Sequence, residues 1–230
     1  MHGLKHFWQS TIGKKVVMAV TGIIGILFVI GHMSGNFLMF KGAGAMHEYA
    51  LLLRTSMPVL YLVRAVLVAA VVLHALAAYQ LTMRSRAARP QGYAKLEPQV
   101  TTLAARTIRW GGVLLLVFIV FHIAQITLGW VGVPDFVHLD PYNNLRNGLS
   151  NPLIAGFYII AMAALGLHLY HGSWAVVRTL GVARPTQHPL KRRVALVIAI
   201  VVAVGFAVIP IAVLAGAFPY EPSPVTAGGH

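Results

Sequence analysis

Five long apolar runs dominate the chain and alternate with shorter, more polar segments. They cover residues 16–40, 59–82, 110–130, 153–177 and 194–218. A helix needs roughly 20 apolar residues to cross the hydrocarbon core of a membrane, and each run meets that length. The pattern therefore predicts an all-α integral membrane protein: one domain over residues 1–230, built as a bundle of five transmembrane helices.

The segments between the runs differ in character. Residues 41–58 show helical apolar spacing in their middle, and Pro58 suits the start of the second helix. Residues 131–152 are rich in turn formers, so we expect them to lie along the membrane surface.

The positive charges give the predicted helices an orientation. The formal net charge is +13, and most Lys and Arg residues lie before the first run, in segment 83–109 or in segment 178–193. The other side of the membrane holds only Lys41, Arg54 and Arg146, with Arg64 just inside the second run. By the positive-inside rule we expect a multi-pass protein of the cytoplasmic membrane, with its N-terminus cytoplasmic and its C-terminus outside. Such basic loops suit contact with anionic membrane lipid or a partner subunit, and we expect no nucleic-acid binding.

The amino-acid composition excludes several classes of protein and of metal site. Hydrophobic residues make up 58% and charged residues 10%, too little polar surface for a soluble protein of this size. The absence of cysteine excludes iron–sulfur clusters, thiolate metal sites and c-type haem attachment within the chain. All five acidic residues fall outside the apolar runs, whereas ion-coupled transporters commonly place carboxylates in mid-membrane.

Histidines occupy the mid-membrane positions instead. His32, His74, His122 and His168 each lie in a different apolar run, and a buried polar ring costs free energy unless it gains a partner. At 1.5 Å per residue, His32 and His122 lie about 24 and 18 Å from the inner side, hence in the outer half of the membrane. His74 and His168 lie about 22 Å from the outer side, hence in the inner half.

Two histidines at equal depth on different helices can supply the two axial ligands of a haem iron. We therefore predict that His32 and His122 bind an outer haem b, and that His74 and His168 bind an inner one. The rise of the helices separates the two layers by roughly 10–15 Å. His171 lies three residues after His168, so helical periodicity alone leaves both open as the inner ligand.

Four segments resemble a known family: IGKKVVMAVTGIIGILFVIGHMSGN, MHEYALLLRT, FHIAQ and HLYHGSWAVVRTLG. Together with the histidine spacing, they make residues 10–217 similar to the single-chain, five-helix, di-haem cytochrome b anchor of succinate:quinone oxidoreductases and fumarate reductases. The resemblance implies that one haem is held by the first and third spans and the other by the second and fourth. It favours His168, four residues before Gly172, although some fumarate reductases place the ligand directly before the glycine, which would be His171.

Family membership would also imply partners and a substrate. A flavoprotein and an iron–sulfur protein would bind on the cytoplasmic side, and a membrane quinone, often menaquinone in di-haem members, would react near the outer haem. The chain would then be the quinone-reacting subunit of succinate dehydrogenase, with succinate oxidation in the partner subunits. Some di-haem fumarate reductases carry a glutamate in the fourth span; this chain has none, so a proton path of that kind is not expected.

Quinone reduction needs a hydrogen-bonding or proton-exchanging group beside the carbonyl oxygens. The outer side offers His47, Glu48, Arg54 and Arg64 as candidates for binding quinone or haem propionates, although interfacial solvation would also explain these residues. Three other functions stay open: the b subunit of a fumarate reductase, that of another quinone-linked dehydrogenase, and a non-redox membrane protein with packing histidines.

The histidine pairs generate the first test. We expect the purified protein to contain about two haems b per chain with low-spin, bis-histidine spectra, because two depth-matched pairs are present. A pyridine haemochrome assay against protein concentration measures this ratio. A ratio near one, or no haem, would contradict the pairing.

Overall fold

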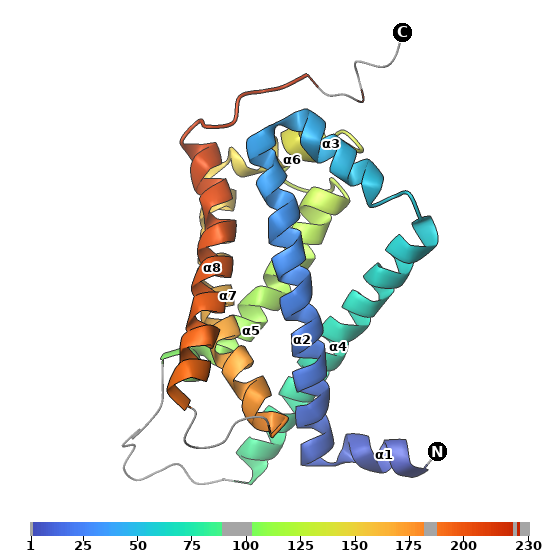
Figure 1. The fold of residues 1–230 in the computed structure, drawn as a ribbon, viewed down its shortest axis with the longest axis vertical. Coiled ribbons are helices and arrows are strands. Elements are labelled where there is room, and N and C mark those ends of the chain that lie inside the picture. The colour runs from blue at the N-terminus through green and yellow to red at the C-terminus, as the bar shows by residue number, and fades with distance from the viewer. Residues whose placement is uncertain (1, 89–102, 182–187, 223–224, 226–230) are drawn as a thin grey trace.

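The chain folds into a helical bundle (Figure 1). The computed structural model describes residues 2–88, 103–181, 188–222 and 225; Arg89, Lys95, Glu97 and Arg184 of the charge analysis lie outside them. The helices are α1 (His2–Gln9), α2 (Thr11–Asn36), the 3-10 helix η1 (Phe37–Lys41), α3 (Ala43–Leu52), α4 (Met57–Ala87), α5 (Leu103–His122), the π-helix η2 (Ile123–Thr127), α6 (Pro141–Leu149), α7 (Pro152–Thr179) and α8 (His188–Leu214). No strand occurs among the described residues.

Five helical segments are long and apolar enough to cross a membrane, as predicted. They are Thr11–Lys41, Met57–Ala87, Leu103–Thr127, Pro152–Thr179 and Leu190–Leu214. We call the end of the bundle that carries α1 the inner end and the end that carries α3 and α6 the outer end, after the predicted topology. The protein is thus an all-α, multi-pass membrane protein.

The helix ends differ from the predicted ones at both membrane faces. At the inner end α4 continues to Ala87 and α5 begins at Leu103, because Arg and Thr side chains can extend a helix beyond the hydrocarbon and remain hydrated. At the outer end the third span stops at Thr127 rather than near residue 130. Gly129 follows with a φ of +65°, a left-handed conformation that ends a helix.

A short helix, α1, was not predicted and extends sideways from the inner end of α2 (Figure 1). Ser10 separates the two helices and caps α2: its backbone is extended and its hydroxyl oxygen accepts a hydrogen bond from the Gly13 amide at 2.8 Å. The Lys14 ammonium group donates to the Trp8 carbonyl and lies 5.3 Å from the centre of the Trp8 ring. These contacts fix the turn between α1 and α2.

The outer end is covered by α3 and α6. The helical spacing in residues 41–58 is confirmed as α3, whereas the turn-rich composition of residues 131–152 concealed α6. Asp140 caps α6 by accepting a hydrogen bond from the Asn143 amide at 3.1 Å, and Pro141 fits the first helical turn. Acidic and proline residues therefore start this helix although they read as turn formers in the sequence.

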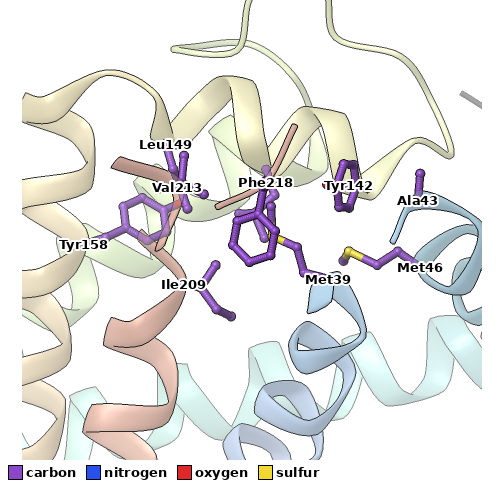
Figure 2. Close-up of a cluster of buried hydrophobic side chains, with 10 residues drawn as sticks. Met39, Ala43, Met46, Tyr142, Leu149, Tyr158, Ile209, Val213 and Phe218 are labelled. Carbon is purple, nitrogen blue, oxygen red and sulfur yellow. The ribbon is translucent and has the colours of Figure 1, made fainter. Parts of the chain in front are cut away.

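A hydrophobic cluster joins this cover to the membrane helices (Figure 2). Met39 from η1, Met46 from α3 and Leu149 from α6 meet Tyr158 of α7 and Phe218 of the C-terminal segment. Burial of side chains of this size contributes about 1.5–3 kcal/mol each. The cluster therefore fixes the surface helices on the ends of α7 and α8.

Hydrogen bonds hold the segment after α8 against α3 and α6. The Glu221 carboxylate accepts a hydrogen bond from the Ala43 amide at 2.6 Å, at the N-terminus of α3, where negative charge is favourable. Asn143 donates to the Glu221 carbonyl at 2.8 Å. Burial raises the pKa of Tyr142, and the Glu221 carboxylate adds to the shift, so the phenol stays protonated and donates to the Pro219 carbonyl at 3.0 Å.

The five spanning helices differ in how many neighbouring helices each one contacts. α7 packs against α8 and α5, and α2 packs against α4, α7 and α8, whereas α4 rests mainly on α2. Toward its outer end α4 leans away from the rest of the bundle (Figure 1). α4 and α5 are thus attached to the bundle along one main face each.

Small residues set the distance between α7 and α8. A Cβ atom added to Gly166 would lie 2.9 Å from the Ala203 Cβ and 3.6 Å from the Ala199 carbonyl oxygen. Leu169, Ala199 and Val202 form the buried cluster beside this contact. The close approach depends on the missing side chain at position 166.

We expect Gly166→Ala to destabilise the protein by about 1 kcal/mol, because overpacking costs about 1–3 kcal/mol and exceeds the helix-propensity gain of about 0.5–1 kcal/mol. Gly31→Ala is the matched control, since Gly31 is exposed on α2 and an added Cβ meets nothing within 4 Å. Thermal unfolding in detergent, followed by circular dichroism, compares the two variants. Equal melting temperatures would show that α7 and α8 are not packed this closely.

Candidate haem-binding site

The structure brings four spanning-helix histidines together in two pairs. His32 of α2 faces His122, the last residue of α5, with ring centres 5.8 Å apart and ring planes at 78°. His74 of α4 faces His168 of α7, with ring centres 6.0 Å apart and ring planes at 54°. These are the pairs that depth along the helices predicted. Their role as iron ligands stays a prediction.

The two pairs lie at different depths. Thr21, which contacts His74, and His32 are eleven residues apart on α2, which corresponds to about 16 Å of helix. Tyr158, which contacts His122, and His168 are ten residues apart on α7, or about 15 Å. Both helices thus give nearly the same separation, at or just above the upper end of the range expected from sequence.

Aromatic rings surround the outer pair. Phe28 stacks on His32 with ring centres 5.3 Å apart and planes at 10°, and Phe206 lies 5.8 Å from the same ring. Phe118 stacks on His122 at 5.7 Å. The imidazoles therefore sit in an apolar environment in which each ring nitrogen needs a partner from the protein or from a ligand.

One histidine in each pair is held by a hydroxyl group. The His74 Nδ1 lies 3.1 Å from the Thr21 hydroxyl oxygen, and that hydroxyl donates to the Val17 carbonyl at 2.7 Å. Because the Thr21 proton is already used, its oxygen accepts a hydrogen bond from His74 Nδ1–H. The His122 Nδ1 likewise lies 2.9 Å from the Tyr158 hydroxyl oxygen. With Nδ1 bonded in this way, Nε2 carries the free lone pair that binds a metal.

The spacing of the rings fits a shared metal ion. An imidazole nitrogen lies about 2.0–2.1 Å from a bound metal, so two rings on opposite sides of one ion have centres about 6 Å apart. The observed 5.8 and 6.0 Å agree with that value. No group of three or more His, Asp or Glu side chains suited to a metal ion occurs in the part of the chain that the structure describes. A metal held by two histidines needs its remaining ligands from elsewhere, and a porphyrin supplies four.

A haem also needs open space beside its ligands, and the structure has such space beside His168. A cavity of about 370 Å³ lies between α5 and α7, lined by Thr107, Trp110, Gly111, Leu114, Ala164 and His168. His168 Nδ1 is buried and has no hydrogen-bond partner. Added Cβ atoms at Gly25 and Gly172 would meet nothing within 4 Å. At the inner pair, the residues present therefore fit a flat apolar macrocycle between α5 and α7.

Not every small residue near a histidine leaves space. An added Cβ at Gly35 would lie 2.6 Å from the Tyr49 ring, so α3 packs against this part of α2. Gly35 therefore serves the contact between α2 and α3.

At the inner pair, the ring in contact with His74 belongs to His168. His171, one helical turn away, is half-buried and close enough to His168 to interact with it electrostatically. This geometry favours His168, as did the resemblance, and the identity of the ligand stays a prediction.

The four residues predicted for the quinone region lie near the outer end but do not form one hydrogen-bonded group. His47 Nδ1 lies 2.9 Å from the Leu139 carbonyl oxygen and ties α3 to the segment before α6. Arg54 donates to the Ala50 carbonyl at 2.9 Å. Arg64 lies on α4, 6.0 Å from the centre of the Tyr61 ring, and Glu48 is exposed. Their role toward quinone stays a prediction.

Three polar residues beside the histidines were not predicted as part of the site. Thr21 and Tyr158 contact His74 and His122, and Gln125 contacts Tyr158. Thr21 and Gln125 stand in apolar helices, and a buried polar residue in such a helix is the signal that could have marked them. Tyr158 is less distinctive, because tyrosine is common near the ends of spanning helices.

Comparisons with known proteins add no identification. No family model, no curated protein and no solved structure matches this chain. The candidate site therefore rests on the geometry above.

We expect His74→Ala or His168→Ala to remove the inner haem while the outer haem remains, because the two pairs occupy separate layers. His171→Ala is the matched control, a histidine of the same helix, and should retain both haems. Haem content and the reduced-minus-oxidised spectrum of each variant measure the outcome. Loss of the inner signal in His171→Ala but not in His168→Ala would place the ligand at His171.

Proposed function

We propose that the chain is a di-haem cytochrome b: the membrane-anchor subunit of a succinate:quinone oxidoreductase. The observation that carries the proposal is the pair of facing imidazoles at each of two depths, spaced for one metal ion per pair. Bound haem would supply reversible one-electron chemistry at each depth. The family resemblance of the sequence motifs agrees with this assignment.

Several roles follow for the residues of this chain. His32, His122, His74 and His168 would hold the two haem irons. Thr21 and Tyr158 would keep His74 and His122 in the tautomer that leaves Nε2 free. The apolar rings of Phe28, Phe118 and Phe206 would exclude water from the outer site.

The inner end suits soluble partners. Basic side chains gather there on described helices, among them exposed Lys15, Arg84 and Arg178. No acidic residue lies on the described part of this end, so the surface favours an acidic protein face or anionic lipid. An iron–sulfur subunit bound to a flavoprotein would there deliver electrons to the nearer pair of histidines.

The outer end would hold the quinone. Glu48 is exposed and could exchange protons, and His47 lies beside it on α3. Quinone reduction takes up two protons, which a site at this end would draw from the outer side.

A non-redox membrane protein is the main alternative, and the site argues against it. Placing four imidazoles in an apolar bundle is costly unless each gains partners, and the buried His168 Nδ1 has none in the protein. A b subunit of fumarate reductase or of another quinone-linked dehydrogenase would use the same histidines, and only its partners would differ.

Purification of the N-terminally tagged protein from its native membranes in mild detergent tests the proposal. We expect a flavoprotein and an iron–sulfur protein to co-purify, succinate to reduce the b haems, and the complex to transfer electrons from succinate to a soluble quinone. His122→Ala should retain the partners but lose the outer haem, and its quinone turnover should fall to background.

The possible results separate the alternatives. A wild-type protein without haem would contradict any cytochrome function. Two haems that succinate leaves oxidised, with a different dehydrogenase co-purified, would assign the chain to another quinone-linked complex.

A further inference from the structure

A continuous hydrogen-bond chain links the outer cover of the bundle to His122. Gln125 Nε2 lies 3.3 Å from the Gly148 carbonyl oxygen and 3.4 Å from the Gly132 carbonyl oxygen. Its Oε1 lies 2.6 Å from the Tyr158 hydroxyl, which in turn lies 2.9 Å from His122 Nδ1. The chain thus connects α6 and the segment before it with a predicted iron ligand.

The two backbone carbonyls fix the direction of every proton in this chain. Carbonyl oxygens only accept hydrogen bonds, so the amide nitrogen of Gln125 faces them and its oxygen faces Tyr158. Tyr158 therefore donates its single proton to Gln125, and its oxygen must accept from His122. His122 consequently carries its proton on Nδ1, with Nε2 unprotonated.

The hydrogen-bond chain lies in a buried and closely packed part of the fold. The π-helix Ile123–Thr127 begins directly after His122, and π-helical turns recur at functional sites because they redirect side chains within a helix. Gln125 is fully buried, and Tyr158 belongs to the hydrophobic cluster of the outer end. Burial of both side chains favours the hydrogen bonds that they make here, because an unpaired polar group would be costly in this environment.

The two layers differ in their supporting hydroxyl groups. The inner His74 donates to an aliphatic hydroxyl that is bonded only within its own helix, whereas the outer His122 donates to a phenol polarised by a buried amide. An acceptor on Nδ1–H raises the basicity of the ligating nitrogen, and a more basic ligand stabilises ferric over ferrous iron.

We propose that Tyr158, oriented by Gln125, is a positioning residue that holds His122 as a haem ligand and lowers the midpoint potential of the outer haem. This inference rests on the proposed di-haem function. The Gly132 and Gly148 carbonyls at the outer end, which orient Gln125, would therefore also influence that potential.

Potentiometric titration of the two haems, followed optically in the purified holoprotein, tests the proposal. Tyr158→Phe removes the acceptor, so we expect the potential of the outer haem to rise while that of the inner haem stays unchanged. Tyr142→Phe is the matched control: it removes another buried phenol of the same cluster, one that donates to the Pro219 carbonyl, and should move neither potential. Gln125→Leu removes the polarising oxygen and should raise the outer potential less than Tyr158→Phe does.

The results separate this proposal from the proposed function. Wild-type protein without haem overturns the proposed function and this inference with it. Two haems whose potentials are the same in wild type and in Tyr158→Phe overturn only the inference. If Tyr158→Phe loses the outer haem while Tyr142→Phe keeps it, positioning is supported, and the potential in Gln125→Leu then decides the electronic effect: a rise supports it and an unchanged value overturns it.

Discussion

Inside a hydrocarbon layer no water is present to satisfy a polar side chain, and the arrangement of this bundle depends on how it meets that constraint. Four partly buried imidazoles lie on four helices, and two of them are bonded through Nδ1 to hydroxyl groups of neighbouring helices. Within each pair the rings lie at the spacing that a shared metal ion requires. The proposed haems would lie between these helices, and a planar ligand there would account for the limited contact of α4 and α5 with the rest of the bundle.

The two ends of the bundle differ in how they are covered and in their charge. The outer end is closed by α3, α6 and the segment after α8, which are tied together by hydrogen bonds from Arg146 to Phe218 and from Tyr142 to Pro219. That closure gives Gln125 two fixed carbonyls to bond. At the inner end the described residues form α1 beside the start of α2 and expose basic side chains. A hydrogen-bonded outer end and a basic inner face agree with the proposal that soluble partners deliver electrons at the inner end.

The sequence was sufficient to predict features that depend only on the order and spacing of residues along the chain. Hydropathy and length predict the five spans, and helical rise alone pairs His32 with His122 and His74 with His168. Features that depend on contacts between distant segments were missed. Tyr158 meets His122 across 36 positions of sequence, and the π-helix that follows His122 leaves no mark in the residue pattern. α6 was hidden because Asp140 and Pro141, which start it, also favour turns.

The order of the helices along the chain bears on biosynthesis. Each histidine pair joins an early helix to one that emerges about 90 residues later, which at a synthesis rate of roughly 5–20 residues per second is a delay of about 5–18 seconds. His74 of α4 and its hydrogen-bond partner Thr21 of α2 both lie early in the chain, whereas His168, the other ring of the pair, lies on the later helix α7. α5 completes the outer pair sooner, yet His122 gains its Tyr158 acceptor only with α7. The proposed inner haem would bind to this pair only after insertion of the fourth span, because a chain arrested before that span leaves His74 without the second ring.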